Sequence, residues 1–331
     1  MRLKARSSHK LIFSMIVGAS LTAAAAANAA DWRGWNIHVE GYPNTVALDK
    51  FAELVTEKTN GEITPQNFHA GVLGNQPDAI EQVRVGAIEY GNFNLGPMGT
   101  VVPEVDVVNL PFIFKDLDHM YRVMNGPVGE EIGAAMAAKG LTPITWYNSG
   151  SRSFYNSKHP IKTPEDLKGL KLRVMNNELF VGMVEALGGN ATPMAFGEVF
   201  QSIKTGVVDG AENNPASYDS VNHYEVAKYY SFSEHLIIPE CLCVNTKVWD
   251  GLSDEHKAVV KKAAQESAEL MRKLWDERVE ASRKKVVASG VEFNDVADKQ
   301  AFQKAMEPVY AKAIETNPTL DALIKKIKAV D

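Results

Sequence analysis

Two spacings of hydrophobic residues alternate along most of the chain. Residues 35–40 alternate between apolar and polar side chains and predict a strand, and residues 45–59 carry apolar residues at helical spacing. The same succession returns several times, with strands predicted at 63–68, 88–95, 142–147, 171–175 and 207–211 and helices at 76–86, 116–139, 177–187 and 197–205. This alternation predicts an α/β fold with a largely parallel sheet.

One helical pattern is much longer than the others. It begins after Ser253, a predicted N-cap, and contains neither glycine nor proline until Gly290. At 1.5 Å per residue such a helix is roughly 50 Å long, enough to lie across two lobes. Two lobes are also expected from length, because about 300 residues exceed what one hydrophobic core usually organises.

The first 29 residues have the pattern of a signal peptide. Basic residues precede an uncharged, alanine-rich run from Leu11 to Ala27, and small residues follow it, so we expect cleavage after Ala29. A retained membrane anchor is less favoured, because the run is short and the polar Asp31 follows closely. The sequence therefore predicts export to the periplasm.

The charge of the chain limits the classes of ligand. The net charge is −6, and loss of the four basic residues of the leader would leave about −10. An acidic protein is a poor binder of nucleic acid. If the ligand is an anion, its attraction must come from locally placed arginines.

Local signatures of catalysis are missing from the sequence. It contains no Gly-x-Ser-x-Gly elbow, His-Glu-x-x-His pair, Walker loop or Gly-x-Gly-x-x-Gly turn. Its eight histidines are scattered, and no two have metal-ligand spacing on a shared helix face. We therefore expect no enzyme activity, no metal and no cofactor.

The only two cysteines, Cys241 and Cys243, are separated by one residue. On a strand they would share one face, but a Cys-x-Cys disulfide is strained. Buried free thiols are favoured, although a disulfide stays possible because the periplasm is oxidising.

Two arginines at the ends of predicted elements are candidates for binding an acid. Arg152 follows the strand 142–147, and Arg173 lies on the polar face of the strand 171–175. The planar guanidinium group can hold a carboxylate through two parallel hydrogen bonds. For each arginine alone, an ion pair within the protein is the more common role.

Four segments together resemble the DctP-type substrate-binding proteins of tripartite ATP-independent periplasmic (TRAP) transporters: 71–76, 166–175, 193–200 and 206–214. The resemblance implies a two-lobed periplasmic-binding-protein-like fold, with a cleft between lobes that are joined by crossing strands and spanned by the long helix. The expected lobes are 30–149 plus about 236–275, and 150–235 plus about 276–331, after the signal peptide 1–29.

The resemblance also implies the ligand site. Arg173 matches the principal carboxylate clamp of the family, and Arg152 matches a second basic position. The other positions that match ligand contacts are Asn213, Phe196, Gln76, Asn94, His38 and Asn44. Amides at 76 and 94 differ from the carboxylates of sialic-acid binders, so sialic acid is disfavoured.

The segments 147–156 and 212–214 are most similar to members that bind sugar acids such as glucuronate or galacturonate. A C4-dicarboxylate or a short hydroxy acid stays open. The resemblance implies delivery of the acid to the small and large membrane subunits of a sodium-coupled TRAP importer. A periplasmic enzyme that processes sugar acids and a sensor that reports the ligand are the alternatives.

Overall fold

The computed structural model of the protein describes residues 30–331, so the predicted signal peptide lies outside the described residues. Within this range nine strands form one sheet in the order β2-β1-β3-β8-β4-β7-β5-β6, with β9 beside β8. The strands are β1 Ala30–Asn36, β2 Ile63–Phe68, β3 Tyr90–Asn94, β4 Leu141–Asn156, β5 Lys171–Val174, β6 Asn190–Pro193, β7 Gly210–Asn213, β8 Tyr229–Asn245 and β9 Glu292–Asp295. Over residues 30–331, no helix has the length and apolar character needed to cross a membrane.

Two long strands, β4 and β8, run antiparallel through the middle of the sheet and divide it into two halves. The first half contains β1, β2 and β3, and the second contains β5, β6 and β7. Strands within each half are parallel, but β3 pairs antiparallel with β8 and β7 pairs antiparallel with β4. The prediction of a largely parallel sheet was therefore right for each half and wrong at the centre.

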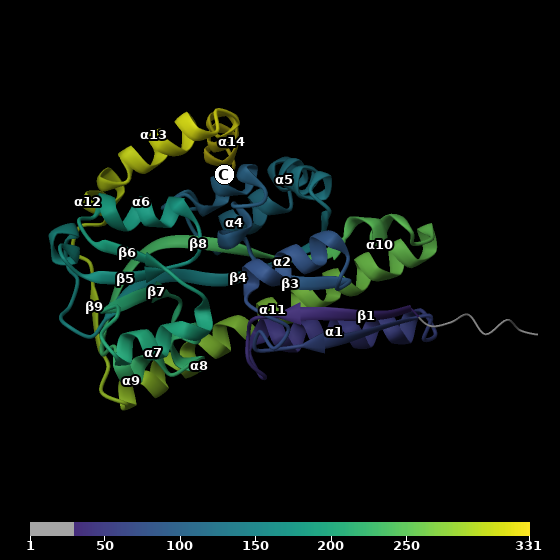
Figure 1. The fold of residues 1–331 in the computed structure, drawn as a ribbon, viewed down its shortest axis with the longest axis horizontal. Helices are drawn as coiled ribbons and strands as arrows, with labels where there is room; N and C mark the ends of the chain where they lie inside the picture. The colour runs from purple at the N-terminus through teal and green to yellow at the C-terminus, as the bar shows by residue number, and fades with distance from the viewer. Residues whose placement is uncertain (1–29) are drawn as a thin grey trace, which may run out of the picture.

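Helices cover both faces of this sheet (Figure 1). The α-helices are α1 Pro43–Lys58, α2 Gln76–Val85, α3 Leu95–Met98, α4 Leu117–Met124, α5 Pro127–Ala138, α6 Glu178–Ala186, α7 Val199–Lys204, α8 Pro215–Ser220, α9 His223–Val226, α10 Thr246–Asp250, α11 Asp254–Ala288, α12 Lys299–Ala305, α13 Glu307–Thr316 and α14 Thr319–Lys328. Three 3₁₀ helices are η1 Pro103–Asn109, η2 Pro164–Leu167 and η3 Phe196–Glu198. The mixed α/β class is confirmed, whereas the C-terminal helices α12 to α14 were not predicted.

The long helix α11 confirms the prediction from residues 253–289. The Ser253 hydroxyl accepts a hydrogen bond from the backbone N–H of His256, and Gly290 follows the helix with a φ of +79°. The helix contacts α1 in the first half and α8 in the second. It therefore bridges the two halves along one face of the sheet (Figure 1).

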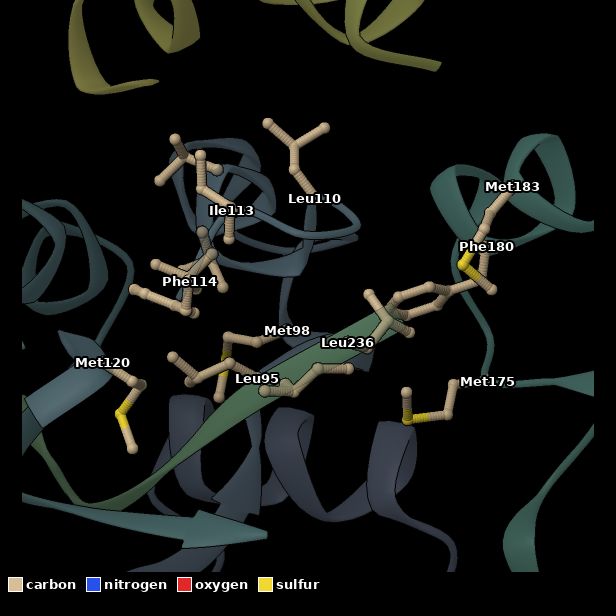
Figure 2. Close-up of a cluster of buried hydrophobic side chains, with 14 of the residues drawn as sticks. Leu95, Met98, Leu110, Ile113, Phe114, Met120, Met175, Phe180, Met183 and Leu236 are labelled. Carbon is tan, nitrogen blue, oxygen red and sulfur yellow. The ribbon is translucent and has the colours of Figure 1, made fainter. Parts of the chain in front are cut away.

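The hydrophobic cores differ between the two faces of the sheet. On the face covered by α2 to α6 and α12 to α14, one cluster of buried side chains continues across both halves. Figure 2 shows Leu95 and Met98 from the first half and Met175 and Phe180 from the second on either side of Leu236 on β8. On the opposite face, one core packs under α1 and α11, and a separate core packs under α7 to α9. Among residues 30–331, the cluster that continues across both halves therefore lies on one face, and on the other face the second half contributes Ala216 of α8 to the core under α1 and α11.

The two cysteines form a disulfide, so the favoured prediction of free thiols was wrong. Cys241 and Cys243 on β8 have a Cα–Cα distance of 5.6 Å, inside the range that a disulfide requires. Both side chains are fully buried in the common core. The strand brings the two sulfurs to one face, as the spacing indicated.

Candidate functional site

A cavity lies where strand ends from the two halves meet. Parallel strands β1 and β3 of the first half and β5 and β6 of the second end next to its walls, and β4 and β8 pass through it. The empty space of the cavity is about 570 Å³, including open solvent at its mouth. The carboxyl ends of parallel strands are the usual place for ligands in α/β sheets. Its lining includes Ile37, His38, Asn75, Gln76, Pro77, Asn94, Pro97, Ser149, Arg152, Arg173, Met175, Asn176, Ala195, Phe196, Asn213, Ser217 and Glu240.

Arg173 on β5 is buried in the wall of this cavity, with 3% of its surface exposed. Its Nε and Nη2 donate hydrogen bonds to the carbonyl oxygen of Met194 at 3.0 and 2.8 Å. Among residues 30–331 it forms no ion pair, and its Nη1 makes no hydrogen bond there. Burial lowers the pKa of Arg173 to about 10, a value at which the group still carries its charge at neutral pH.

Arg152 on β4 also lines the cavity, but it is held in an internal ion pair. Its Nε and Nη2 donate to the two carboxylate oxygens of Glu212 at 2.5 and 2.7 Å. Its Nη1 donates to the Asn213 Oδ1 atom at 2.8 Å. Burial alone would lower the pKa of Arg152, but the carboxylate of Glu212 outweighs it and raises the pKa. Arg152 thus has the more common role of a buried arginine, which is an ion pair within the protein.

Each arginine has a buried, uncharged histidine close by. Burial and the charge of Arg173 lower the pKa of His223 to about 3, and burial and the charge of Arg152 do the same for His235. His223 shares a hydrogen bond of 2.6 Å with the hydroxyl of Tyr155. Both imidazoles are therefore neutral at pH 7, so neither adds a cation to the site.

Asn213 and Phe196 complete the wall of the second half. The Asn213 oxygen accepts hydrogen bonds from Arg152 and from Asn214, which leaves its amide nitrogen for another acceptor. The ring centroid of Phe196 lies 5.9 Å from the guanidinium carbon of Arg173, within the range of a cation–π contact. An amide donor and an aromatic ring thus stand beside the one unpaired cation of this wall.

Amides from the first half face this wall. Gln76, the first residue of α2, donates to the carbonyl oxygen of Asn94 at 2.8 Å. The Asn94 nitrogen donates to the Ser149 hydroxyl at 3.1 Å, and its oxygen caps α3 through the N–H of Gly96. Both side chains therefore have fixed positions before any ligand contacts them.

The remaining predicted residues, His38 and Asn44, both contact Glu240. His38 lines the cavity, and its Nε2 lies 3.1 Å from both oxygens of Glu240. Asn44 is fully buried, does not line the cavity, and donates to Glu240 at 2.8 Å. The structure thus brings seven of the eight predicted residues to the cavity and places Asn44 behind them.

The sequence reasoning missed Glu240, which also lines the cavity. A signal was present, because Glu240 is the only charged residue in the otherwise apolar run 236–244. A buried charge in such a run needs partners, which is a reason to expect a site. Glu212, the ion-pair partner of Arg152, was likewise not predicted.

The groups that meet here are suited to holding a polar acid. In the described part of the chain, no group of three or more His, Cys, Asp or Glu side chains is arranged to bind a metal ion. The cavity instead offers one unpaired guanidinium, several amides and an aromatic ring. Such groups can bind a carboxylate and hydroxyl groups through hydrogen bonds and charge.

Comparisons with known proteins agree with this geometry. The family model "Bacterial extracellular solute-binding protein, family 7", DctP, matches residues 36–317. A solute-binding protein of Chromohalobacter salexigens is 51% identical, over 99% of this chain and 97% of its own. A TRAP periplasmic solute-binding protein from Roseobacter denitrificans, solved with bound β-D-glucuronate, is 61% identical and has a TM-score of 0.90 over 91% of this chain and 100% of its own. A Sulfitobacter TRAP solute-binding protein, solved with bound β-D-galacturonate, is 59% identical and has a TM-score of 0.87 over 89% of this chain and 98% of its own.

Proposed function

The chain belongs to the DctP family of bacterial extracellular solute-binding proteins, and from this premise we propose that it captures a uronate and delivers it to a TRAP transporter. Members of this family bind solutes and are not enzymes. The alternative of an enzyme that processes sugar acids therefore has no support.

One observation carries the proposal, which is the buried arginine without an acid. Arg173 lines a cavity and forms no ion pair with any carboxylate of residues 30–331. A buried charge is costly unless a partner of opposite sign compensates it. A ligand carboxylate supplies that partner, and Nη1 is the nitrogen available to it.

The rest of the cavity supports a sugar acid as the ligand. Sugar hydroxyl groups need hydrogen-bond partners when they are buried, and the amides of Gln76, Asn94 and Asn213 provide such partners on both sides. Phe196 offers an apolar surface next to Arg173. The solved relatives hold β-D-glucuronate and β-D-galacturonate, which are six-carbon acids of this kind.

The two halves of the sheet suit a mechanism of capture by closure. We place one lobe at 30–149 plus about 236–275 and the other at 150–235 plus about 276–331. The ligand carboxylate first binds Arg173 and Asn213, and closure then adds Gln76, Asn94 and His38 from the first lobe. Arg152 contributes by fixing Asn213. The bound ligand thereby stabilises the closed form.

The proposed setting is the periplasm of a Gram-negative cell. The leader 1–29 directs export, and the closed protein docks on the small and large membrane subunits of a sodium-coupled importer. The family supports this assignment, because its members are extracellular solute-binding proteins. Genes for these subunits next to that of the protein would distinguish transport from a sensor role.

Calorimetric titration of the purified protein tests the ligand class. D-glucuronate, D-galacturonate, D-gluconate and succinate are compared in one buffer, after unfolding and refolding to remove any ligand that co-purifies. We expect a uronate to bind at least tenfold more tightly than gluconate or succinate and to be recovered unchanged. If succinate binds more tightly, the ligand is a C4-dicarboxylate and not a uronate. Turnover of a bound uronate would overturn the assignment to transport.

A further inference from the structure

Glu240 is a buried acid in the cavity that the proposed function leaves unused. It lies on β8, one of the two central strands, and only 1% of its surface is exposed. It pairs across the sheet with Asn94 of β3 and with Tyr147 of β4. Its partner Asn94 belongs to the first half of the sheet, whereas Arg173 belongs to β5 of the second half, and both Glu240 and Arg173 line the cavity.

The partners of Glu240 keep it ionised without a permanent cation. Three amides donate to it, from Asn44 at 2.8 Å, Asn92 at 2.7 Å and Asn94 at 3.5 Å. His38 lies 3.1 Å from both of its oxygens and stacks on the ring of Tyr42. Burial raises the pKa of Glu240, but His38 and the amide hydrogen bonds outweigh it and lower the pKa. The only ion-pair contact of Glu240 within residues 30–331 is with His38, which is charged only when it is protonated, and no lysine or arginine there pairs with it.

The two oxygens of Glu240 are not equally occupied. Oε2 accepts short hydrogen bonds from Asn44 and Asn92. Oε1 has only the long contact with Asn94, in addition to the imidazole that both oxygens share. Each carboxylate oxygen can accept about two hydrogen bonds, and one of those of Oε1 is only the 3.5 Å contact with Asn94. A donor that enters the cavity can therefore take the place of this long contact on Oε1.

The cavity thus has a cation on one side and an anion on the other. A ligand that satisfies both must have a carboxylate at one end and hydroxyl donors at the other. A uronate meets this requirement. A dicarboxylate of the same length would bring a second negative charge toward Glu240, and two like charges in a site of low dielectric repel strongly.

Building on the proposed function, we propose that Glu240 is the residue that selects hydroxylated monocarboxylates over dicarboxylates. Its Oε1 atom accepts a hydrogen bond from a sugar hydroxyl in place of the long contact with Asn94, and its charge excludes a second carboxylate. The amides around it hold it in place, so Asn44 and Asn92 are positioning residues that do not contact the ligand.

The test compares Glu240→Gln with the wild type on two six-carbon acids that differ at carbon 1. D-glucuronate has an aldehyde there and closes to a ring, whereas D-glucarate is open-chain with a carboxylate at each end, so the change of preference between the two proteins is the quantity that reports on Glu240. We expect the wild type to prefer glucuronate by at least 100-fold. In Glu240→Gln we expect glucuronate to bind about tenfold more weakly and glucarate to bind more tightly, so that the preference falls at least tenfold.

The control is Asp219→Asn, which alters another buried carboxylate, one that pairs with Arg278 and Lys285 of α11 and does not line the cavity. This variant should lose stability and keep the preference for glucuronate. A gain of glucarate binding by Glu240→Gln cannot come from partial unfolding, so it identifies a role in selection.

The failure of this proposal is distinct from the failure of the proposed function. If the wild type binds glucuronate and Glu240→Gln keeps the full preference, selection by Glu240 is wrong and uronate capture stands. Equal weakening of both ligands likewise reduces Glu240 to a structural role. If the wild type binds no uronate, the proposed function fails first.

Discussion

Two buried arginines, 21 residues apart in the chain, line one cavity under opposite conditions. Arg152 is held by both oxygens of Glu212, and the pair raises its pKa. Arg173 has only the carbonyl oxygen of Met194, and burial lowers its pKa to about 10. Arginine thus stabilises the fold at position 152 and is available to a ligand at position 173.

The comparison shows which information identifies a binding arginine. Position in the cavity does not separate the two, since both line it and both have 3% of their surface exposed. The difference lies in the acidic partner: Glu212 compensates the charge of Arg152, whereas no carboxylate of residues 30–331 compensates the charge of Arg173. Three experiments test this difference.

The largest effect is expected from breaking the internal pair. Arg152→Met leaves Glu212 buried without its cation, which typically costs about 3–5 kcal/mol. We expect the free energy of unfolding of the ligand-free protein, measured in urea, to fall by this amount. The double variant Arg152→Met, Glu212→Leu should recover most of the loss, because an apolar pair replaces both charges.

If the free energy of unfolding of Arg152→Met lies within about 1 kcal/mol of the wild-type value, the Arg152–Glu212 pair does not stabilise the fold. If the double variant is as unstable as Arg152→Met, Arg152 stabilises the protein through Asn213 rather than through Glu212. Calorimetry of the folded variants reports the separate effect on ligand affinity.

The second effect concerns binding rather than stability. Arg173→Gln removes a cation that has no acidic partner in the described chain, so the ligand-free protein should keep its free energy of unfolding or gain slightly. Affinity for the uronate should fall by about 2–4 kcal/mol, or roughly 30- to 1,000-fold, because the ligand carboxylate loses its partner. Isothermal titration calorimetry measures this loss.

The matched control is Arg84→Gln, which removes an exposed arginine paired with Glu81 on α2. It should change neither ligand affinity nor stability by more than about 1 kcal/mol. Undiminished affinity in Arg173→Gln would move the carboxylate site elsewhere in the molecule.

The smallest effect, taken per pH unit, is a dependence of stability on pH that both arginine environments share. The pKa values of His223 and His235 are about 3 in the folded protein, below the ordinary 6.5. The unfolded chain therefore takes up protons first as the pH falls below 6.5, and the folded state loses stability from there toward pH 3. Each histidine contributes at most about 1.4 kcal/mol per pH unit.

Urea unfolding at several values between pH 7.5 and 5 measures this slope. His223→Gln and His235→Gln should each reduce it by a similar amount, whatever their effect on stability at pH 7.5. An unchanged slope in His223→Gln would mean that this imidazole binds protons equally in the folded and unfolded states, so that its pKa is not lowered in the folded protein.

The helices were predictable because their signals are local. The cap at Ser253 and the spacing of apolar residues that follow it defined α11 closely. The central strands were not predictable in this way. Residues 149–153 on β4 contain small polar side chains, and the strand continues through them because β8 pairs along both sides of a bulge. Such pairing joins residues about 90 positions apart, which no local pattern records.

The same limit applied to the site. Arg173 could be predicted from its place on a short strand within a matching segment. The ion pair of Arg152 could not be predicted, because Glu212 lies 60 residues away and only the fold brings the two side chains together. Glu240 stood out as a lone charge in an apolar run, but its four partners come from segments far apart in the chain.

The disulfide next to Glu240 has a practical consequence for the study of selectivity. Cys241 follows Glu240 directly and is bonded to Cys243 on the same strand. Protein produced in a reducing cytoplasm would carry two thiols at this point, because cellular reductants keep cysteines reduced there. Samples exported to an oxidising compartment during production are therefore the appropriate material for comparing one acid with another.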